Sequence, residues 1–288
     1  MFRKWVSLVP ALAGVVIWTT CGAAGRPARS FRYGQWGQMT SFADKAGTQI
    51  NYYLFAPRAA EGGRRLPLVL WLHGGVKANG VGGPEIVQDA FYKDQQQKDH
   101  PCYVLRPVAV RGENWVSPRG PGTASHKMPE QPSKSIAAVV ELLDKIVAEK
   151  GIDTDRLYVF GASMGGYGTW DLIQRYPGKF AAAMPICGGG DPSKADSLKH
   201  TAIWVTHGEN DRIVPPRGSR EMFDALMKAR GQEPVVKDDA RALRKASPDD
   251  RLRYYEYKGG NHNSAWDNGL TEADLVEWFF SKRAKESP

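Results

Sequence analysis

The sequence predicts an α/β fold with a mostly parallel central sheet flanked by helices and an antiparallel hairpin at the N-terminal edge. Two observations support this prediction. From about Leu66 onward, short β-rich apolar runs alternate with helical patterns, which is typical of a parallel sheet covered by helices. Most of these runs are continuous in apolar residues, as expected of strands buried on both faces.

The apolar runs predict six strands, at 66–72, 103–110, 157–160, 181–186, 202–206 and 253–257. Ahead of them, residues 35–42 and 50–56 alternate apolar and polar positions around Lys45, Ala46 and Gly47. This alternation predicts the antiparallel hairpin at the edge of the sheet.

Helices are predicted at 133–150, 221–230 and 271–282, and the first of them is the best defined. Ile136, Val139, Leu143 and Val147 recur there at helical spacing, and Gly151 ends the pattern. Two connections, 115–132 and 232–251, are too long for simple turns. The second is dense in mixed charge, so we interpret it as a solvated insertion, with a flap over the site as the other interpretation.

The first 24 residues predict a secretory signal peptide. Arg3 and Lys4 precede an apolar stretch at 5–18 and small residues at 21–24, a run too short for a comfortable membrane span. Residues 25–288 are then a single domain of a secreted or periplasmic protein, with no stable membrane span in the mature chain. An uncleaved anchor and a lipid on Cys21 are the alternatives.

Charge and cysteine content limit the kinds of ligand and cross-link that the sequence predicts. The formal charge is +8, but basic and acidic residues alternate instead of forming a basic block, which argues against nucleic-acid binding. Cys102 and Cys187 are predicted at opposite ends of the sheet, too far apart for a disulfide, so both should be buried thiols. No Cys/His spacing indicates zinc, and we expect neither a metal nor an organic cofactor.

The strongest chemical signal is Gly161-Ala162-Ser163-Met164-Gly165, between the strand at 157–160 and a helix. A serine on a sharp strand-to-helix turn has a strained backbone, and small residues on either side let neighbouring chain approach closely. The context therefore predicts Ser163 as a catalytic nucleophile. An ordinary glycine-rich turn is the structural alternative.

Such a nucleophile needs two backbone donors for the oxyanion. One is the amide of the next residue, Met164. The other should follow the first long strand, where His73-Gly74-Gly75-Val76 stands. Gly75 is the predicted donor and Val76 the alternative, with His73 bracing the loop.

A serine hydroxyl also needs a base, and only three histidines follow Ser163. His200 precedes its strand, at the wrong end of a parallel sheet, and His207 is expected to pack beneath its own loop. His262 follows the last strand in a glycine-rich loop at the carboxyl edge, so it is the predicted base.

For the acid, Asp211 lies just past the penultimate strand, within reach of the loop that bears His262. Glu209 and then Asp267 are the alternative acids. The alternative without a catalytic role is that Asp211 caps a turn or a helix. Trp115 and Trp266 are predicted on loops at the same edge, as aromatic walls for an acyl or sugar group, although either could equally be an ordinary aromatic.

These residues resemble the α/β-hydrolase family, and within it the secreted carbohydrate-esterase (feruloyl and acetylxylan esterase-like) and phospholipase/carboxylesterase-like branch. The resemblance spans about 66–282 and is carried by the segments 70–75, 155–167, 207–211 and 262–266. It implies ester hydrolysis through a Ser-His-Asp triad and an acyl-enzyme, on feruloyl or acetyl groups of plant polysaccharides or on short acyl esters. The segment after Gly75 departs from the loop that many relatives show.

Two other functions are compatible with these patterns. A peptidase of the prolyl-oligopeptidase type shares the catalytic domain, but it commonly carries a propeller, and only about 40 residues separate the predicted signal from the first long strand. An inactive carbohydrate-binding protein of the same fold would have no need of a complete triad.

Overall fold

The computed structural model describes residues 35–75, 88–116 and 127–284. The chain divides into two units, residues 1–30 and 31–288. The described residues all belong to the second unit. The predicted signal peptide at 1–24 and the alternative oxyanion donor Val76 lie outside the described residues.

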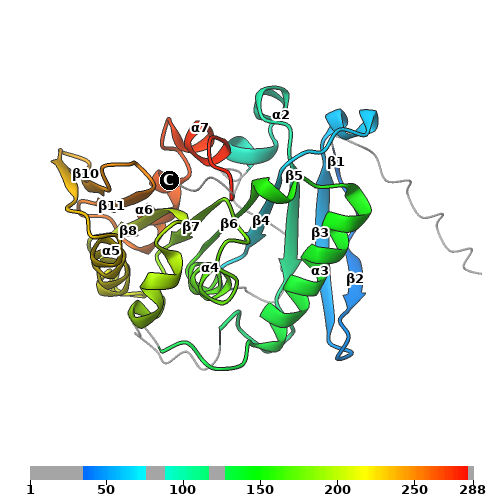
Figure 1. Ribbon diagram of the computed structural model, residues 1–288, viewed down its shortest axis with the longest axis horizontal. Coiled ribbons are helices and arrows are strands. Elements are labelled where there is room, and N and C mark those ends of the chain that lie inside the picture. Colours follow the sequence, from blue (N-terminus) through cyan, green and yellow to red (C-terminus); the bar gives the residue numbers. More distant parts are fainter. Residues whose placement is uncertain (1–34, 76–87, 117–126, 285–288) are drawn as a thin grey trace, which may run out of the picture. The chain divides into compact units, whose positions relative to one another are not determined.

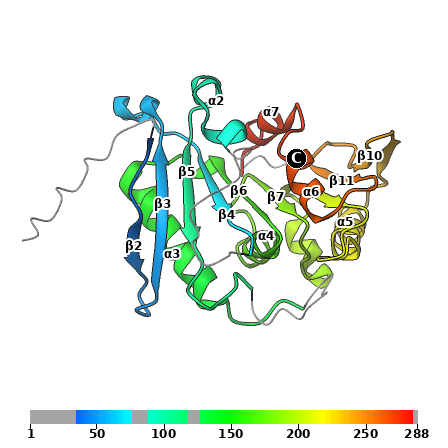
Figure 2. The ribbon, with the colours of Figure 1, turned by 180° about the vertical axis from the view of Figure 1, so that it is seen from behind.

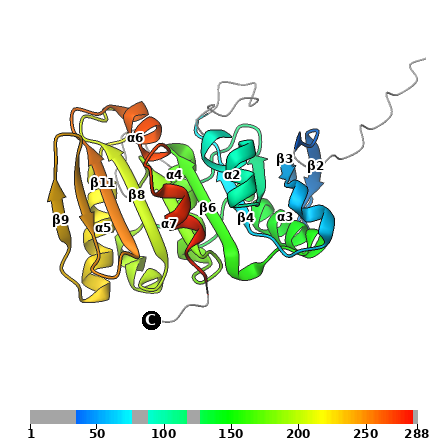
Figure 3. The ribbon, with the colours of Figure 1, turned by 90° about the horizontal axis from the view of Figure 1, so that it is seen from above.

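In the described part of the chain, eleven strands form one sheet in the order β1-β3-β5-β4-β6-β7-β8-β11-β10-β9, with β2 paired to β3. Figure 3 shows the sheet running from β2 and β3 at one edge to β9 at the other. The strands are β1 (Gln35–Trp36), β2 (Thr40–Ala43), β3 (Gln49–Ala56), β4 (Leu68–Leu72), β5 (Tyr103–Val108), β6 (Leu157–Ala162), β7 (Ala182–Ile186), β8 (Ala202–Gly208), β9 (Val235–Asp238), β10 (Ala242–Ala246) and β11 (Leu252–Tyr257).

The six strands from β5 to β11 in the middle of the sheet pair in parallel. They are the six strands that the apolar runs predict, with ends shifted by at most two residues. The predicted N-terminal hairpin is formed by β2 and β3, and β3 pairs antiparallel with β5. The sequence prediction of the fold class is therefore confirmed.

The segment 232–251 is largely exposed, as the interpretation of a solvated insertion expects, but it is neither an irregular loop nor a flap. Most of the segment forms β9 and β10, an antiparallel pair that extends the sheet beyond β11. The sequence pattern does not indicate these strands, because all four residues of β9 are exposed and β10 is only partly buried. Backbone hydrogen bonds stabilise such an edge without a hydrophobic pattern.

Helices cover both faces of the sheet. Leu68, Leu70 and Leu72 of β4 pack in one core cluster with α3, α4 and α5, whereas Val69 and Trp71 pack in another with α6 and α7. Figure 1 shows α3, α4 and α5 in front of the sheet, and Figure 2 shows α6 on the opposite face. The helices are α2 (Asp94–Asp99), α3 (Lys134–Lys150), α4 (Met164–Arg175), α5 (Arg217–Arg230), α6 (His262–Gly269) and α7 (Leu275–Phe280).

Helix α3 matches its prediction to within one residue. The Ser133 hydroxyl accepts from the amide of Ile136 as N-cap, and Gly151 ends the helix in the left-handed conformation. Helix α5 starts four residues earlier than predicted, and α7 is shorter. The expected glycine-rich loop precedes α6, which has Asn261 as its N-cap and begins at His262.

Cys102 and Cys187 are buried and unpaired, as predicted. Burial raises the pKa of the Cys102 thiol to about 12, against a weaker opposing hydrogen bond from Gln97. Within the described ranges, no helix combines the length and the apolar character needed to cross a membrane.

Candidate active site

Ser163 occupies a strained turn between β6 and α4. Its backbone angles are φ 56° and ψ −116°, a left-handed conformation that side chains other than glycine rarely adopt. Neighbouring backbone permits this turn only because the flanking residues lack side chains. A Cβ on Gly161 would stand 2.5 Å from the Gly165 carbonyl oxygen, and a Cβ on Gly165 would stand 2.0 Å from that of Leu72.

The turn places Ser163 at the amino end of α4. The Ser163 amide donates to the Ile186 carbonyl at the end of β7, and its carbonyl accepts from Tyr167 in the first turn of the helix. Both bonds fix the backbone and leave the hydroxyl uninvolved. The amide of Met164 begins the helix, where unpaired N–H groups favour negative charge.

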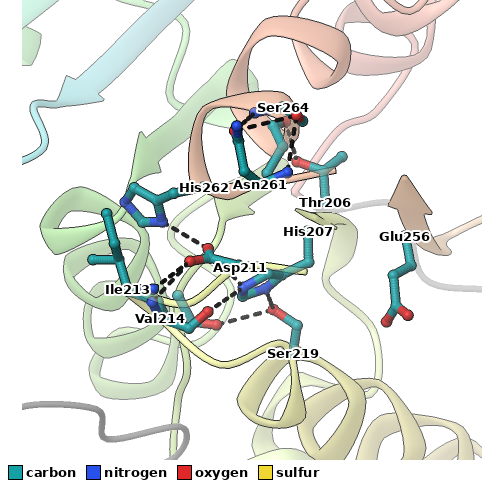
Figure 4. Close-up of polar contacts among 12 residues, drawn as sticks. Thr206, His207, Asp211, Ile213, Val214, Ser219, Glu256, Asn261, His262 and Ser264 are labelled. Carbon is teal, nitrogen blue, oxygen red and sulfur yellow. Dashed lines mark hydrogen bonds and ion pairs between the residues drawn. The ribbon is translucent and has the colours of Figure 1, made fainter. Parts of the chain in front are cut away.

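Asp211 and His262, predicted from separate loops, are joined by a short hydrogen bond. His262 Nδ1 lies 2.6 Å from Asp211 Oδ2. Figure 4 shows the two side chains facing each other. The Asp211 side chain is fully buried and that of His262 is 17% exposed. Because Nδ1 is engaged, Nε2 is the ring nitrogen available to a reacting group.

The ends of β8 and β11 bring this pair together. The two strands are parallel, with Tyr257 opposite Gly208. The Asn210 amide donates to the Gly260 carbonyl at 2.8 Å, and a Cβ on Gly208 would stand 2.3 Å from the Asn261 carbonyl oxygen. Glycine at 208 thus lets the two loops touch.

Asp211 is held as a carboxylate. Burial by itself raises its pKa, but hydrogen bonds from His207, His262 and two backbone amides outweigh burial and hold the pKa well below its ordinary value. The amides are those of Ile213 and Val214, each 2.9 Å from Oδ1. The negative charge beside His262 is therefore permanent at neutral pH.

The three predicted triad residues follow β6, β8 and β11, which lie within four neighbouring strands of the sheet. Cys187, at the end of the intervening β7, lies beside Ser163, Asp211 and His262. Among the described residues, the Ser163 hydroxyl makes no direct hydrogen bond to His262. Catalytic hydrogen bonds are often long in an unliganded enzyme and shorten when substrate binds.

Ligand atoms of Cys187, Asp211 and His262 lie within 4.8 Å of one another, which raises the question of a metal site. The donors do not fit one. Asp211 and His262 are in direct hydrogen-bond contact, and burial raises the pKa of the Cys187 thiol, so that it keeps its proton. A metal requires a thiolate and room between its ligands.

His73 orients the loop that carries Gly75. Its Nε2 accepts from the Ala109 amide at 3.0 Å, so the ring hydrogen is on Nδ1, which donates to the Gly74 carbonyl at 2.7 Å. Burial lowers the pKa of His73, which keeps the ring neutral. The C=O and N–H of a trans peptide point in opposite directions, so fixing the Gly74 carbonyl also fixes the Gly75 amide.

The prediction that Trp115 forms a wall for substrate needs correction. The side chain is fully buried, and its indole N–H donates to the His73 carbonyl at 2.8 Å. Trp115 therefore supports the His73 loop and presents no face to a ligand. Trp266 is half-buried on α6, where it packs against the core, and its contact with substrate stays a prediction.

Comparison with known proteins identifies related sequences. The model of the family Esterase, described as "Putative esterase", matches residues 43–275. The bifunctional acetylxylan esterase/xylanase XynS20E of Neocallimastix patriciarum is 32% identical over 99 residues, 34% of this chain and 15% of that protein. Poly(3-hydroxyalkanoate) depolymerase C of Paucimonas lemoignei is 26% identical over 219 residues, 59% and 50% of the two chains.

Two solved structures show the same fold. A thermostable esterase is 32% identical and superimposes with a TM-score of 0.68, over 85% of this chain and 62% of its own. An acetyl xylan esterase from Aspergillus awamori, 16% identical, superimposes with a TM-score of 0.61 over 84% and 99% of the chains. The chain spans half or less of the two curated relatives and less than two thirds of the thermostable esterase.

Proposed function

The chain belongs to the Esterase family, whose model covers residues 43–275, and from this premise we propose that it hydrolyses carboxylic esters with Ser163 as nucleophile. The observation that carries the proposal is the buried Asp211 carboxylate, which is hydrogen-bonded to His262. The pair lies at the carboxyl ends of the parallel strands, where Ser163 occupies a strained turn. Ser163, His262 and Asp211 match the arrangement in which an acid orients a histidine base that activates a serine.

In the proposed mechanism, His262 Nε2 takes the proton of the Ser163 hydroxyl as the oxygen attacks the ester carbonyl. Asp211 holds Nδ1 and stabilises the imidazolium that forms. The amides of Met164 and Gly75 donate to the oxyanion, a contribution of about 3 kcal/mol for each donor. His262 then protonates the leaving alcohol, and the same steps with water release the acid from the acyl-enzyme.

The proposed substrates are small or polysaccharide-linked esters with short acyl or aromatic acyl groups. The name of one relative includes acetylxylan esterase, and that of another includes a depolymerase of poly(3-hydroxyalkanoate), which is itself a polyester. We also propose that residues 1–24 direct export, so that such polymers are met outside the cytoplasm. The mechanism needs no metal or organic cofactor.

The test is a panel of substrates at neutral pH: p-nitrophenyl acetate, methyl ferulate, acetylated xylan, a 3-hydroxybutyrate oligomer and a proline p-nitroanilide. We expect kcat/KM for the best ester to exceed that for the anilide by at least about 100-fold, because the amide is the harder bond to cleave. Preferential cleavage of the anilide would favour the peptidase alternative instead. Absence of turnover on every substrate would favour the inactive, carbohydrate-binding alternative.

A further inference from the structure

The carboxylate of Asp211 lies between two imidazoles (Figure 4). His262 Nδ1 is 2.6 Å from Oδ2, and His207 Nε2 is 3.3 Å from the same oxygen. Only His262 has a part in the proposed mechanism. His207 belongs to β8 and is fully buried beneath the loop that follows it, as predicted, and it also contacts Asp211.

The hydrogens on His207 follow from its neighbours. Nε2 faces the Val214 carbonyl at 2.9 Å and Asp211 Oδ2 at 3.3 Å, and since both oxygens only accept, Nε2 carries a hydrogen. Nδ1 lies 2.7 Å from the Ser219 hydroxyl, which itself donates to the Gly188 carbonyl at 3.0 Å.

The surroundings of His207 are acidic. Glu256 of β11 interacts with it electrostatically and is itself bound by Arg220 at 2.6 and 2.8 Å. Burial raises the pKa of Glu256, but the bonds from Arg220 and Tyr254 outweigh it and keep the group ionised. The charged and titratable groups that face His207 and its partner Asp211 are thus Asp211 itself, Glu256 with Arg220 and Tyr254, Cys187 and His262.

We propose that His207 is a second positioning residue for ester hydrolysis, which holds the Asp211 carboxylate from the side opposite His262. The inference rests on the proposed function. Asp211 Oδ1 is already held by two backbone amides, so the donor from His207 completes the set around Oδ2 and stops the carboxylate from turning away from His262. It also withdraws negative charge from the oxygen that His262 shares.

Two consequences follow for catalysis. Without the His207 donor the carboxylate is less firmly oriented, so kcat falls while substrate binding is unaffected. The carboxylate also keeps more of its charge for His262, which favours the protonated imidazole. Since only the unprotonated imidazole acts as base, the acid limb of the kcat/KM profile moves to higher pH.

The test compares His207→Gln with His207→Leu, and with His200→Gln as a control at an exposed histidine. Glutamine retains an N–H donor near the place of Nε2, and leucine has none. For His207→Leu we expect kcat to fall about tenfold or more with KM within about twofold, and the acid limb to move up. For His207→Gln we expect most of kcat to be retained, and for the control no change.

The position of the acid limb does not depend on how much of the protein is folded, so a low yield of His207→Leu leaves this readout intact. If that variant gives no soluble enzyme, Ser219→Ala replaces it, because loss of the Ser219 hydroxyl should move the limb in the same direction by a smaller amount. An unmoved limb in the variant tested, or equal losses of kcat in the glutamine and leucine variants, would overturn the proposal. Absence of ester hydrolysis by the wild type would instead overturn the proposed function.

Discussion

Replacement of Ser163 by alanine is expected to lower kcat for ester hydrolysis by about 10⁴-fold or more. The change removes the single oxygen that forms the acyl-enzyme and leaves the strained turn, its flanking glycines and the Met164 amide in place. Residual turnover then comes from the oxyanion donors and substrate binding alone. The measurement is steady-state hydrolysis of p-nitrophenyl acetate.

The control is Ser197→Ala, at an exposed serine of the short helix at Pro192–Leu198. It should retain wild-type kcat, and both variants should unfold at the wild-type temperature. If Ser163→Ala keeps more than about a hundredth of the wild-type kcat, another group is the nucleophile.

Replacement of Asp211 by asparagine is expected to lower kcat by about 10⁴-fold, through the tautomer of His262. The oxygen of the new side chain must stay with the amides of Ile213 and Val214, which only donate. Its NH₂ group then faces His262 Nδ1 and donates to it. The hydrogen of His262 moves to Nε2, which can no longer accept the proton of Ser163.

The matched variant is Glu209→Gln, which tests the alternative acid. Glu209 is exposed and its Oε2 accepts from the Gly259 amide at 2.7 Å, a bond that a glutamine oxygen can keep. We expect this variant to retain most of the activity. The steady-state kcat of both variants is compared between pH 6 and 9. Equal losses in the two variants would contradict the assignment of Asp211 as the orienting acid.

The sequence was sufficient to predict the centre of the sheet because its strands are buried on both faces. Strands β4, β6 and β8 consist entirely of buried residues, so the apolar runs mark them directly. Helix α3 was predictable because Ser133 and Gly151 mark its ends. Strands β9 and β10 carry no such signal, since their side chains are exposed or half-buried at an edge.

The candidate active-site residues were predictable to the extent that their proposed chemistry depends on chain order and strand ends. Ser163 and His262 follow from the glycine pattern and from elimination among the histidines. The contact between His207 and Asp211 was not predictable, because it depends on how the three residues between them turn back at the end of β8. The burial of Trp115 likewise depends on α4, whose Gly168 leaves space for the indole.

The measurement that tests the central claim most directly is labelling of the wild-type enzyme with a fluorophosphonate, followed by intact-mass and peptide mass spectrometry. A fluorophosphonate phosphonylates a serine only where a base and oxyanion donors activate it. We expect one adduct per chain, on the peptide that contains Ser163, and none on Ser163→Ala. An adduct on a different residue, or an active esterase that remains unlabelled, would contradict the account.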